Sequence, residues 1–402
     1  MLQQQLNLVV YFDSILSMEI FYRLEMKLKE REASGLLRSL PAGKSDVDFL
    51  SNDYLGLARS SELKKRIELA YEQLPENLNG ATGSRLLSGN TVYAENLEKD
   101  LAQVFKGEKA LLFNSGYVAN LALLATIPQR GDTIIMDELA HACMKEGARL
   151  SFAEKRSFRH NDVDDLEKNL KKAQGAIFVV VESVYSMDGD FCPLREILDL
   201  CKTYEAHLIV DEAHSTGAMG VKGSGLACSL GVEKEIFARV YTFGKGMGVH
   251  GAVVIGSEPL IQYLINFARA FIYTTALPLH SLVSIRESFS YLGENPGLQS
   301  NLRAKIDYFV QTRIPQLRKK GILTTDSRSA IQGVIVPGVD NARDLASFLQ
   351  NEGMNVRPIL SPTVKMGSER LRVCLHNYNT ETEMDHLTDL IIARFGSSKV
   401  GK

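Results

Sequence analysis

The stretch His207-Leu208-Ile209-Val210-Asp211-Glu212-Ala213-His214 contains an apolar run that ends on a carboxylate. Short, nearly continuous apolar runs are typical of parallel strands that are buried on both faces. Asp211 then stands at the carboxyl end of a strand, where open α/β sheets bind their ligands. A buried carboxylate is costly unless it meets a cation, so this residue predicts a positively charged partner nearby.

Similar apolar runs recur before and after this segment, separated by stretches of helical periodicity. The predicted strands are residues 110–113, 133–136, 176–181, 207–211, 239–243 and 252–255. A helix before the first strand keeps one apolar face, formed by Val92, Leu97, Leu101, Val104 and Phe105. Strands that alternate with helices predict an α/β fold with a mainly parallel sheet.

The same patterns divide the chain into three predicted parts. Residues 1–55 form an N-terminal arm and helix, because the apolar stretch 6–21 is interrupted by Asp13 and Glu19 and lacks the basic start of a secretory signal. Residues 56–288 form the large α/β domain. Beyond about residue 290 a charged helix and strands near 333–336, 355–358 and 371–375 predict a smaller α+β domain over residues 289–402.

Composition excludes several classes of protein. The 402 residues include 46 Lys and Arg against 48 Asp and Glu, without the basic excess of a nucleic-acid-binding protein. Five cysteines lie far apart without a C-x-x-C pair, which predicts neither a disulfide framework nor a metal site and fits a reduced cytoplasm. No other apolar run reaches about 18 residues, so no membrane span is expected.

Three familiar signatures occur only in partial form. Residues 246–251 match G-x-G-x-x-G, but an apolar run follows where a dinucleotide-binding fold needs a helix. Residues 211–214 resemble an ATPase motif, yet Gly43-Lys44-Ser45 lacks the glycine five residues upstream that a phosphate loop requires. The G-x-S-x-G of serine hydrolases and the H-E-x-x-H of zinc enzymes are absent. A dinucleotide oxidoreductase and a non-catalytic cofactor-binding protein stay as alternatives.

The remaining polar residues cluster at predicted strand ends. Residues 113–117 leave a strand and enter a helix, so their backbone N–H groups could hold a phosphate, although a simple turn and cap would look the same. Lys245 lies between two glycines after another strand, where desolvation would lower its pKa and favour a Schiff base. With His214 and Asp211, these residues predict a pyridoxal 5'-phosphate site.

At this point the chain resembles a known family, the α-oxoamine synthases within the fold-type I pyridoxal phosphate enzymes. The resemblance spans roughly residues 25 to 390. Its motifs occur in the family order at residues 50–57, 79–90, 137–142, 185–190, 211–217 and 242–245.

The resemblance implies a role for each matching residue. Lys245 would bond to the cofactor aldehyde, Asp211 would pair with the pyridinium nitrogen, His214 would contact the phenolic oxygen and His141 would stack on the ring. The resemblance also implies further cofactor contacts, namely Ser115, Gly116, Tyr117, Ser186 and Thr242. Ser186 is expected to contact the substrate as well.

The resemblance also implies a second subunit and a substrate pocket. Thr274 and Thr275 match a pair that reaches a phosphate from the neighbouring subunit, which implies a homodimer with shared active sites. Arg372 matches the arginine that grips the amino acid carboxylate, and Asn52 the asparagine that assists it. Arg38 is expected near the acyl chain.

Within the family, Thr242-Phe243-Gly244-Lys245 followed by Gly251-Ala252 is most similar to the subgroup that uses L-alanine. The expected reaction is the decarboxylative condensation of L-alanine with a pimeloyl thioester to give 8-amino-7-oxononanoate, a step of biotin synthesis. Sister synthases that use glycine or serine, or a longer acyl chain, are the alternatives. The sequence does not distinguish coenzyme A from a carrier protein as the acyl donor.

Overall fold

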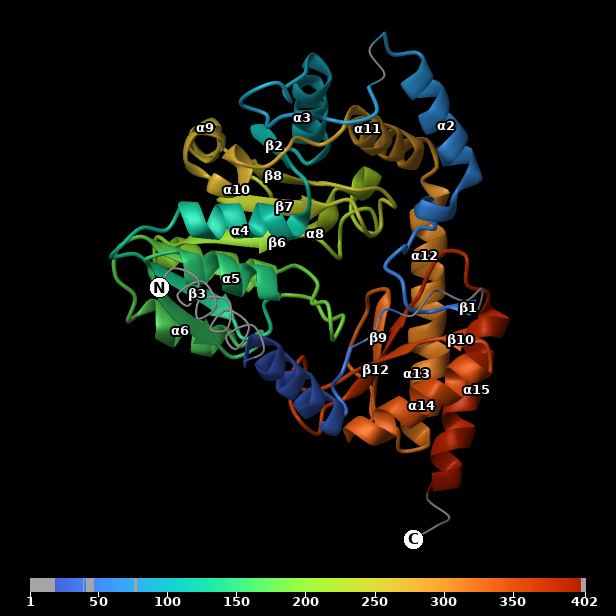
Figure 1. Ribbon diagram of the computed structural model, residues 1–402. Coiled ribbons are helices and arrows are strands. Elements are labelled where there is room, and N and C mark those ends of the chain that lie inside the picture. The colour runs from blue at the N-terminus through green and yellow to red at the C-terminus, as the bar shows by residue number, and fades with distance from the viewer. Residues whose placement is uncertain (1–18, 39, 41–46, 76–77, 399–402) are drawn as a thin grey trace, which may run out of the picture.

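The computed structural model describes residues 19–38, 40, 47–75 and 78–398. Its largest element is a seven-stranded sheet in the order β2-β8-β7-β6-β5-β3-β4 (Figure 1). The strands are β2 (Lys109–Phe113), β3 (Thr133–Asp137), β4 (Glu154–Phe158), β5 (Ile177–Glu182), β6 (His207–Asp211), β7 (Ala238–Thr242) and β8 (Ala252–Gly256).

Strand direction brings the functional ends together. β4, β3, β5, β6 and β7 are parallel neighbours, whereas β8 is antiparallel to both β7 and β2. The carboxyl ends of all strands except β8 therefore meet at one edge, and the chain enters β8 from that same edge. The register places Glu182 beside Asp211 there.

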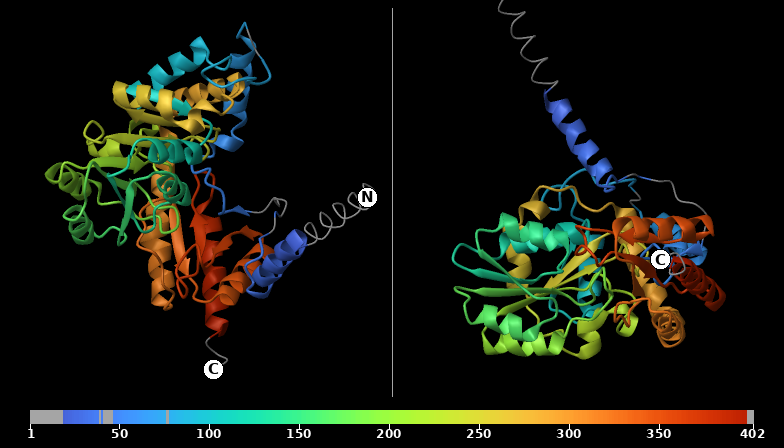
Figure 2. Two further views of the ribbon diagram at one scale, coloured as in Figure 1. Left: turned by 60° about the vertical axis from the view of Figure 1, so that its left-hand side comes forward. Right: turned by 90° about the horizontal axis from the view of Figure 1, so that it is seen from below.

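Successive strand residues point to opposite faces of the sheet, and both faces are covered. Phe178 and Val180 belong to the core beneath α4, α5 and α9, whereas Val179 and Val181 pack toward α6 and α7. This explains why the strand sequences are apolar without alternation. Figure 2 (right) shows the sheet between its helical layers. The helices of this part are α2 (Ser61–Glu72), α3 (Val92–Val104), α4 (Gly116–Thr126), α5 (Ala142–Leu150), α6 (Val163–Leu170), α7 (Leu194–Thr203), α8 (Gly225–Leu230), α9 (Glu258–Phe267), α10 (Arg269–Ile272) and α11 (Leu279–Glu294), with 3₁₀ turns at Leu57–Arg59 and Val221–Gly223.

The C-terminal part forms a second, separate group of strands and helices beside the large sheet (Figure 1). β9 (Ile331–Ile335), β12 (Arg370–Cys374) and β11 (Arg357–Ile359) form an antiparallel sheet in the order β11-β12-β9. β10 (Met354–Asn355) pairs in parallel with β1 (Val47–Asp48), which precedes the large sheet by some 60 residues in the chain. The helices of the C-terminal part are α12 (Gly297–Tyr308), a π-helical turn at Phe309–Arg313, α13 (Ile314–Lys319), α14 (Val339–Asn351) and α15 (Glu381–Ser398).

The fold predicted from the sequence is confirmed: a mainly parallel α/β sheet with a smaller α+β part after it. Every predicted strand of the large sheet is present, and the run after residues 246–251 is indeed β8 rather than a helix. The edge strand β4 was not predicted, because its sequence Glu-Lys-Arg-Ser-Phe is charged and mostly exposed. The proposed limits at residues 55 and 288 stay predictions.

The predicted N-terminal helix lies partly outside the described residues, since residues 1–18 are not described. Residues 19–33 are helical, exposed throughout, and project from the body of the molecule (Figure 2, left). Among the described residues, no helix is both long enough and apolar enough to cross a bilayer.

Candidate active site

Asp211 lies at the carboxyl end of β6 and is almost completely buried. Its Oδ2 accepts a hydrogen bond of 2.6 Å from Asn120 Nδ2, which α4 contributes, and its Oδ1 accepts one of 2.8 Å from Ala213 N. Both bonds hold the carboxylate in one orientation without neutralising its charge. Within the described part of the chain, no cationic side chain is hydrogen-bonded to Asp211, so its charge is available to a positively charged ligand.

Lys245 reaches the same place from the turn after β7. Its amine lies 2.7 Å from Nε2 of His214, which comes from the turn after β6. Desolvation lowers the pKa of Lys245 against the opposing attraction of Asp211 and Glu182, and burial places the pKa of His214 well below its usual value. The turn that carries Lys245 packs closely against the backbone at Thr216. It can do so because Gly246 has no Cβ, since a Cβ there would lie 2.5 Å from Thr216 O. The lysine therefore loses its proton more readily than an exposed lysine does.

These side chains share a cavity of about 270 Å³ at the edge of the sheet. Residues from the turns after β2, β3, β5, β6 and β7 line it, as the strand directions require. The lining residues are Asn52, Ser115, Gly116, Tyr117, Asn120, His141, Cys143, Glu182, Asp211, Ala213, His214, Thr242, Gly244, Lys245, His250 and Gly251.

One end of the cavity fits a phosphate group. Ser115 caps α4 by accepting a hydrogen bond of 3.3 Å from Val118 N, so the positive end of the helix dipole faces the cavity. A Cβ at Gly116 would collide with Thr242 Cγ2. Thr242 Oγ1 is buried without a hydrogen-bond partner among the described residues. A hydroxyl in that state is suited to a ligand oxygen, so the residues present fit a phosphorylated cofactor with a cationic ring.

An imidazole, that of His141, and a second carboxyl group, that of Glu182, also line the cavity. His141 is the N-terminal cap of α5, and its Nδ1 lies 3.0 Å from Cys143 Sγ. Glu182 ends β5 beside Asp211, and burial together with the Asp211 charge raises its pKa. One of its oxygens has no hydrogen-bond partner among the residues that the structure describes. A protonated Glu182 would leave Asp211 as the anion nearest the lysine.

Arg372 brings the C-terminal part of the chain to the site. It lies in β12 and is buried, with Nε donating to Ser186 O at 2.6 Å and Nη2 donating to Asn52 Oδ1 at 2.9 Å. Asn52 itself lines the cavity. A buried guanidinium held by neutral oxygens is available to a carboxylate.

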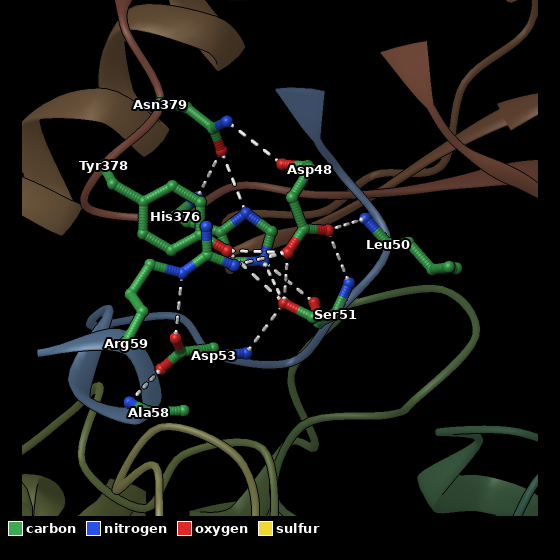
Figure 3. A network of polar contacts seen from close by, with 9 residues as sticks. All are labelled: Asp48, Leu50, Ser51, Asp53, Ala58, Arg59, His376, Tyr378 and Asn379. Carbon is green, nitrogen blue, oxygen red and sulfur yellow. Dashed lines mark hydrogen bonds and ion pairs between the residues drawn. The ribbon is translucent and has the colours of Figure 1, made fainter. Parts of the chain in front are cut away.

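A network of polar contacts holds the segment that carries Asn52 (Figure 3). Asp48 accepts hydrogen bonds of 2.8 Å from Ser51 Oγ, 2.9 Å from Tyr378 OH and 2.8 Å from Arg59 Nη2. His376 Nε2 lies 2.9 Å from Ser51 O, and its ring stacks on Tyr378 at a centroid distance of 4.6 Å. Burial raises the pKa of Asp48, but hydrogen bonds from the backbone N–H groups of Ser51 and Leu50, together with the Ser51 hydroxyl and the nearby His376, outweigh burial and lower the net pKa. The carboxylate therefore stays charged and ties the segment to the C-terminal part.

The structure places the other predicted site residues outside the cavity. Ser186 contributes its backbone oxygen to Arg372, while Thr274 Oγ1 and Thr275 O accept hydrogen bonds from Asn114 Nδ2 at 3.2 and 2.9 Å. Arg38 is exposed on the segment after the N-terminal helix and does not line the cavity.

Sequence reasoning missed Asn120 and Glu182, which line the cavity, and Tyr54, whose hydroxyl oxygen lies 2.7 Å from His214 Nδ1. Glu182 carried the same signal as Asp211, a carboxylate that ends an apolar strand. Asn120 was visible as the one polar side chain inside the apolar helix Val118–Leu124. Tyr54 gave no such signal, because it looks like an ordinary core aromatic residue.

Comparison with known proteins agrees with this geometry. The model of the aminotransferase class I and II family matches residues 44–391. An 8-amino-7-oxononanoate synthase from Emericella nidulans is 41% identical in an alignment of 392 residues that covers 93% of each chain.

Solved structures of similar proteins share the fold over nearly the whole chain. Serine palmitoyltransferase from Sphingomonas wittichii is 27% identical with a TM-score of 0.84, covering 94% of this chain and 98% of the other. A structure of SPT with PLP is 26% identical with a TM-score of 0.83 (95% and 99% covered). The 8-amino-7-oxononanoate synthase from Francisella tularensis is 28% identical with a TM-score of 0.76, covering 88% and 99%.

Proposed function

The chain belongs to the aminotransferase class I and II family, and from this premise we propose that it is a pyridoxal phosphate-dependent C-acyltransferase. The reaction is the condensation of L-alanine with a pimeloyl thioester, which gives 8-amino-7-oxononanoate, carbon dioxide and a free thiol. The observation that carries the proposal is the cavity that Lys245, Asp211 and Asn52 line together, with Arg372 hydrogen-bonded to Asn52. The 41% identity to an enzyme of that name supports the choice of substrates.

Pyridoxal phosphate, when bound, supplies an electron-withdrawing ring that stabilises negative charge on the amino acid Cα. Asp211 would favour a protonated ring nitrogen, because a buried carboxylate strongly favours a neighbouring cation. Lys245 would hold the cofactor between turnovers and, once free, would be the base that takes the proton from the alanine Cα. Ser115, Gly116 and Thr242 would hold the phosphate.

Substrate orientation falls to the C-terminal part of the chain. Arg372 offers a planar pair of donors to the alanine carboxylate, and Asn52 fixes the plane of the guanidinium through its 2.9 Å bond. Fixing the carboxylate aligns the Cα–H bond with the lysine. His141, which lines the cavity, would contact the cofactor ring.

We further propose a cytoplasmic homodimer with shared active sites, in which Thr274 and Thr275 reach the partner's phosphate. Thr274 is half-buried, Thr275 is exposed, and neither lines the cavity of its own subunit, which supports this assignment. All five cysteines are free, in keeping with a reducing compartment.

The test combines purified holoenzyme with pimeloyl coenzyme A and either L-alanine, glycine or L-serine, and measures free thiol. We expect alanine to release thiol far faster than glycine or serine, and the product to have the mass of 8-amino-7-oxononanoate. A preference for L-serine with palmitoyl coenzyme A would overturn the proposal in favour of a serine palmitoyltransferase, the activity named for structures with TM-scores near 0.84.

A further inference from the structure

An unbroken chain of hydrogen bonds connects Arg372 to Lys245. Arg372 Nη2 donates to Asn52 Oδ1 at 2.9 Å, and Tyr54 OH donates to the same oxygen at 3.1 Å. The Tyr54 oxygen lies 2.7 Å from His214 Nδ1, and His214 Nε2 lies 2.7 Å from the Lys245 amine. Of the five residues in this series of hydrogen bonds, Tyr54 alone has no role assigned so far.

The direction of each bond follows from counting protons. A guanidinium only donates, so the Asn52 side chain must turn its oxygen toward Arg372. Tyr54 has a single hydroxyl proton, and donating it to Asn52 leaves only oxygen lone pairs for His214. His214 is uncharged, because burial places its pKa well below the usual value. Its one ring proton must therefore lie on Nδ1, and Nε2 is left to accept a hydrogen bond from the Lys245 amine.

We propose that Tyr54 is a positioning residue that fixes the tautomer of His214 and so couples the Arg372–Asn52 pair to the Lys245 amine. The inference rests on the proposed function for its catalytic meaning, since Arg372 would bind the carboxylate and Lys245 would move the Cα proton. The tautomer itself is a property of this chain's own residues.

The residues around Tyr54 hold its ring in one position. Its side chain is 1% exposed and belongs to the main apolar core. Its backbone oxygen accepts a hydrogen bond of 2.8 Å from Asn377 N, which ties it to the C-terminal part. Only the hydroxyl reaches the site. Tyr54→Phe therefore removes the hydrogen bonds and keeps the packing of the ring.

Histidine side-chain ¹⁵N NMR of the full-length chain, depleted of cofactor, tests the tautomer directly. The His214 signal is identified by its loss in His214→Gln. We expect Nδ1–H in the wild type and loss of that preference in Tyr54→Phe. In Asn52→Ala the Tyr54 proton is released toward Nδ1, so His214 should change to Nε2–H. Tyr291→Phe is the matched control, because it removes a hydroxyl that donates to Glu62 at 3.0 Å, away from the site.

Kinetics of the loaded enzyme supply the second readout. Tyr54→Phe should lower kcat about tenfold, as expected when buried polar groups lose a partner, with the KM for the thioester unchanged. An Nε2–H tautomer in the wild type, or an unchanged tautomer in both variants, would overturn the inference. If wild-type enzyme releases no thiol, the proposed function fails, but the NMR result still decides whether Tyr54 sets the tautomer.

Discussion

Replacing Asp211 with asparagine removes one negative charge and keeps the size of the side chain. The carboxylate is 5% exposed, so its field is only weakly screened by water. At an effective dielectric constant of about 20, two unit charges about 4 Å apart attract by about 4 kcal/mol. If that attraction keeps the ring nitrogen protonated, the variant should lose about a thousandfold in kcat, since about 1.4 kcal/mol corresponds to a factor of ten.

The structure indicates that the fold should survive this change. In the wild type, Asp211 Oδ2 accepts a hydrogen bond of 2.6 Å from Asn120 Nδ2. In the variant an NH₂ group takes the place of that oxygen, so two hydrogen-bond donors would face each other. Asn120 Oδ1 has no hydrogen-bond partner among the described residues, so a turn of the Asn120 amide restores the bond. We therefore expect a melting temperature within a few degrees of the wild type. Thiol release from alanine and pimeloyl coenzyme A gives the rate; a correctly folded variant with at least a tenth of wild-type kcat would refute the reasoning.

Three further predictions concern binding and stability. Arg372→Ala should raise the KM for alanine by at least about tenfold, because a charged hydrogen bond contributes about 1.5–3 kcal/mol, while the KM for the thioester changes little; equal increases in steady-state assays would argue against carboxylate binding. Gly116→Ala should weaken cofactor affinity about tenfold in absorbance titrations, because the new methyl group collides with Thr242 Cγ2, and unchanged affinity would remove the case for this phosphate cradle. His160 is hydrogen-bonded to two carboxylates, which outweigh its burial and raise its pKa to about 10. Its stabilising contribution is complete below about pH 6.5 and lost as the pH rises through about 10. His160→Gln should therefore lower the urea midpoint at pH 6 and have little effect at pH 10.5, and a constant difference across that range would contradict the assigned charge.

The large sheet could be predicted because its strands are buried on both faces, which forces nearly continuous apolar runs such as residues 207–211. β4 escaped prediction for the opposite reason: an edge strand with charged, exposed side chains has no apolar pattern to read. The parallel pairing of β1 with β10 also could not be foreseen, since two-residue strands far apart in the chain leave no periodicity.

The site shows a similar division. Asp211 and Lys245 were identifiable because each follows an apolar strand at the binding edge, and the same rule would have found Glu182. Tyr54 could not be identified in this way, because its ring behaves as core and only its hydroxyl is polar. What it contacts depends on how residues 48–59 pack against the C-terminal part, which is a tertiary property.

Lys245 and Asp211 line one cavity, in which the cofactor would bond to the lysine amine and its charged ring would pair with the carboxylate. Borohydride reduction of the holoenzyme, followed by proteolysis and mass spectrometry, locates the lysine that carries the cofactor. We predict a single phosphopyridoxyl group, on Lys245, and none after Lys245→Ala. Attachment to another lysine, or an unmodified Lys245 in protein that still turns over, would contradict the account.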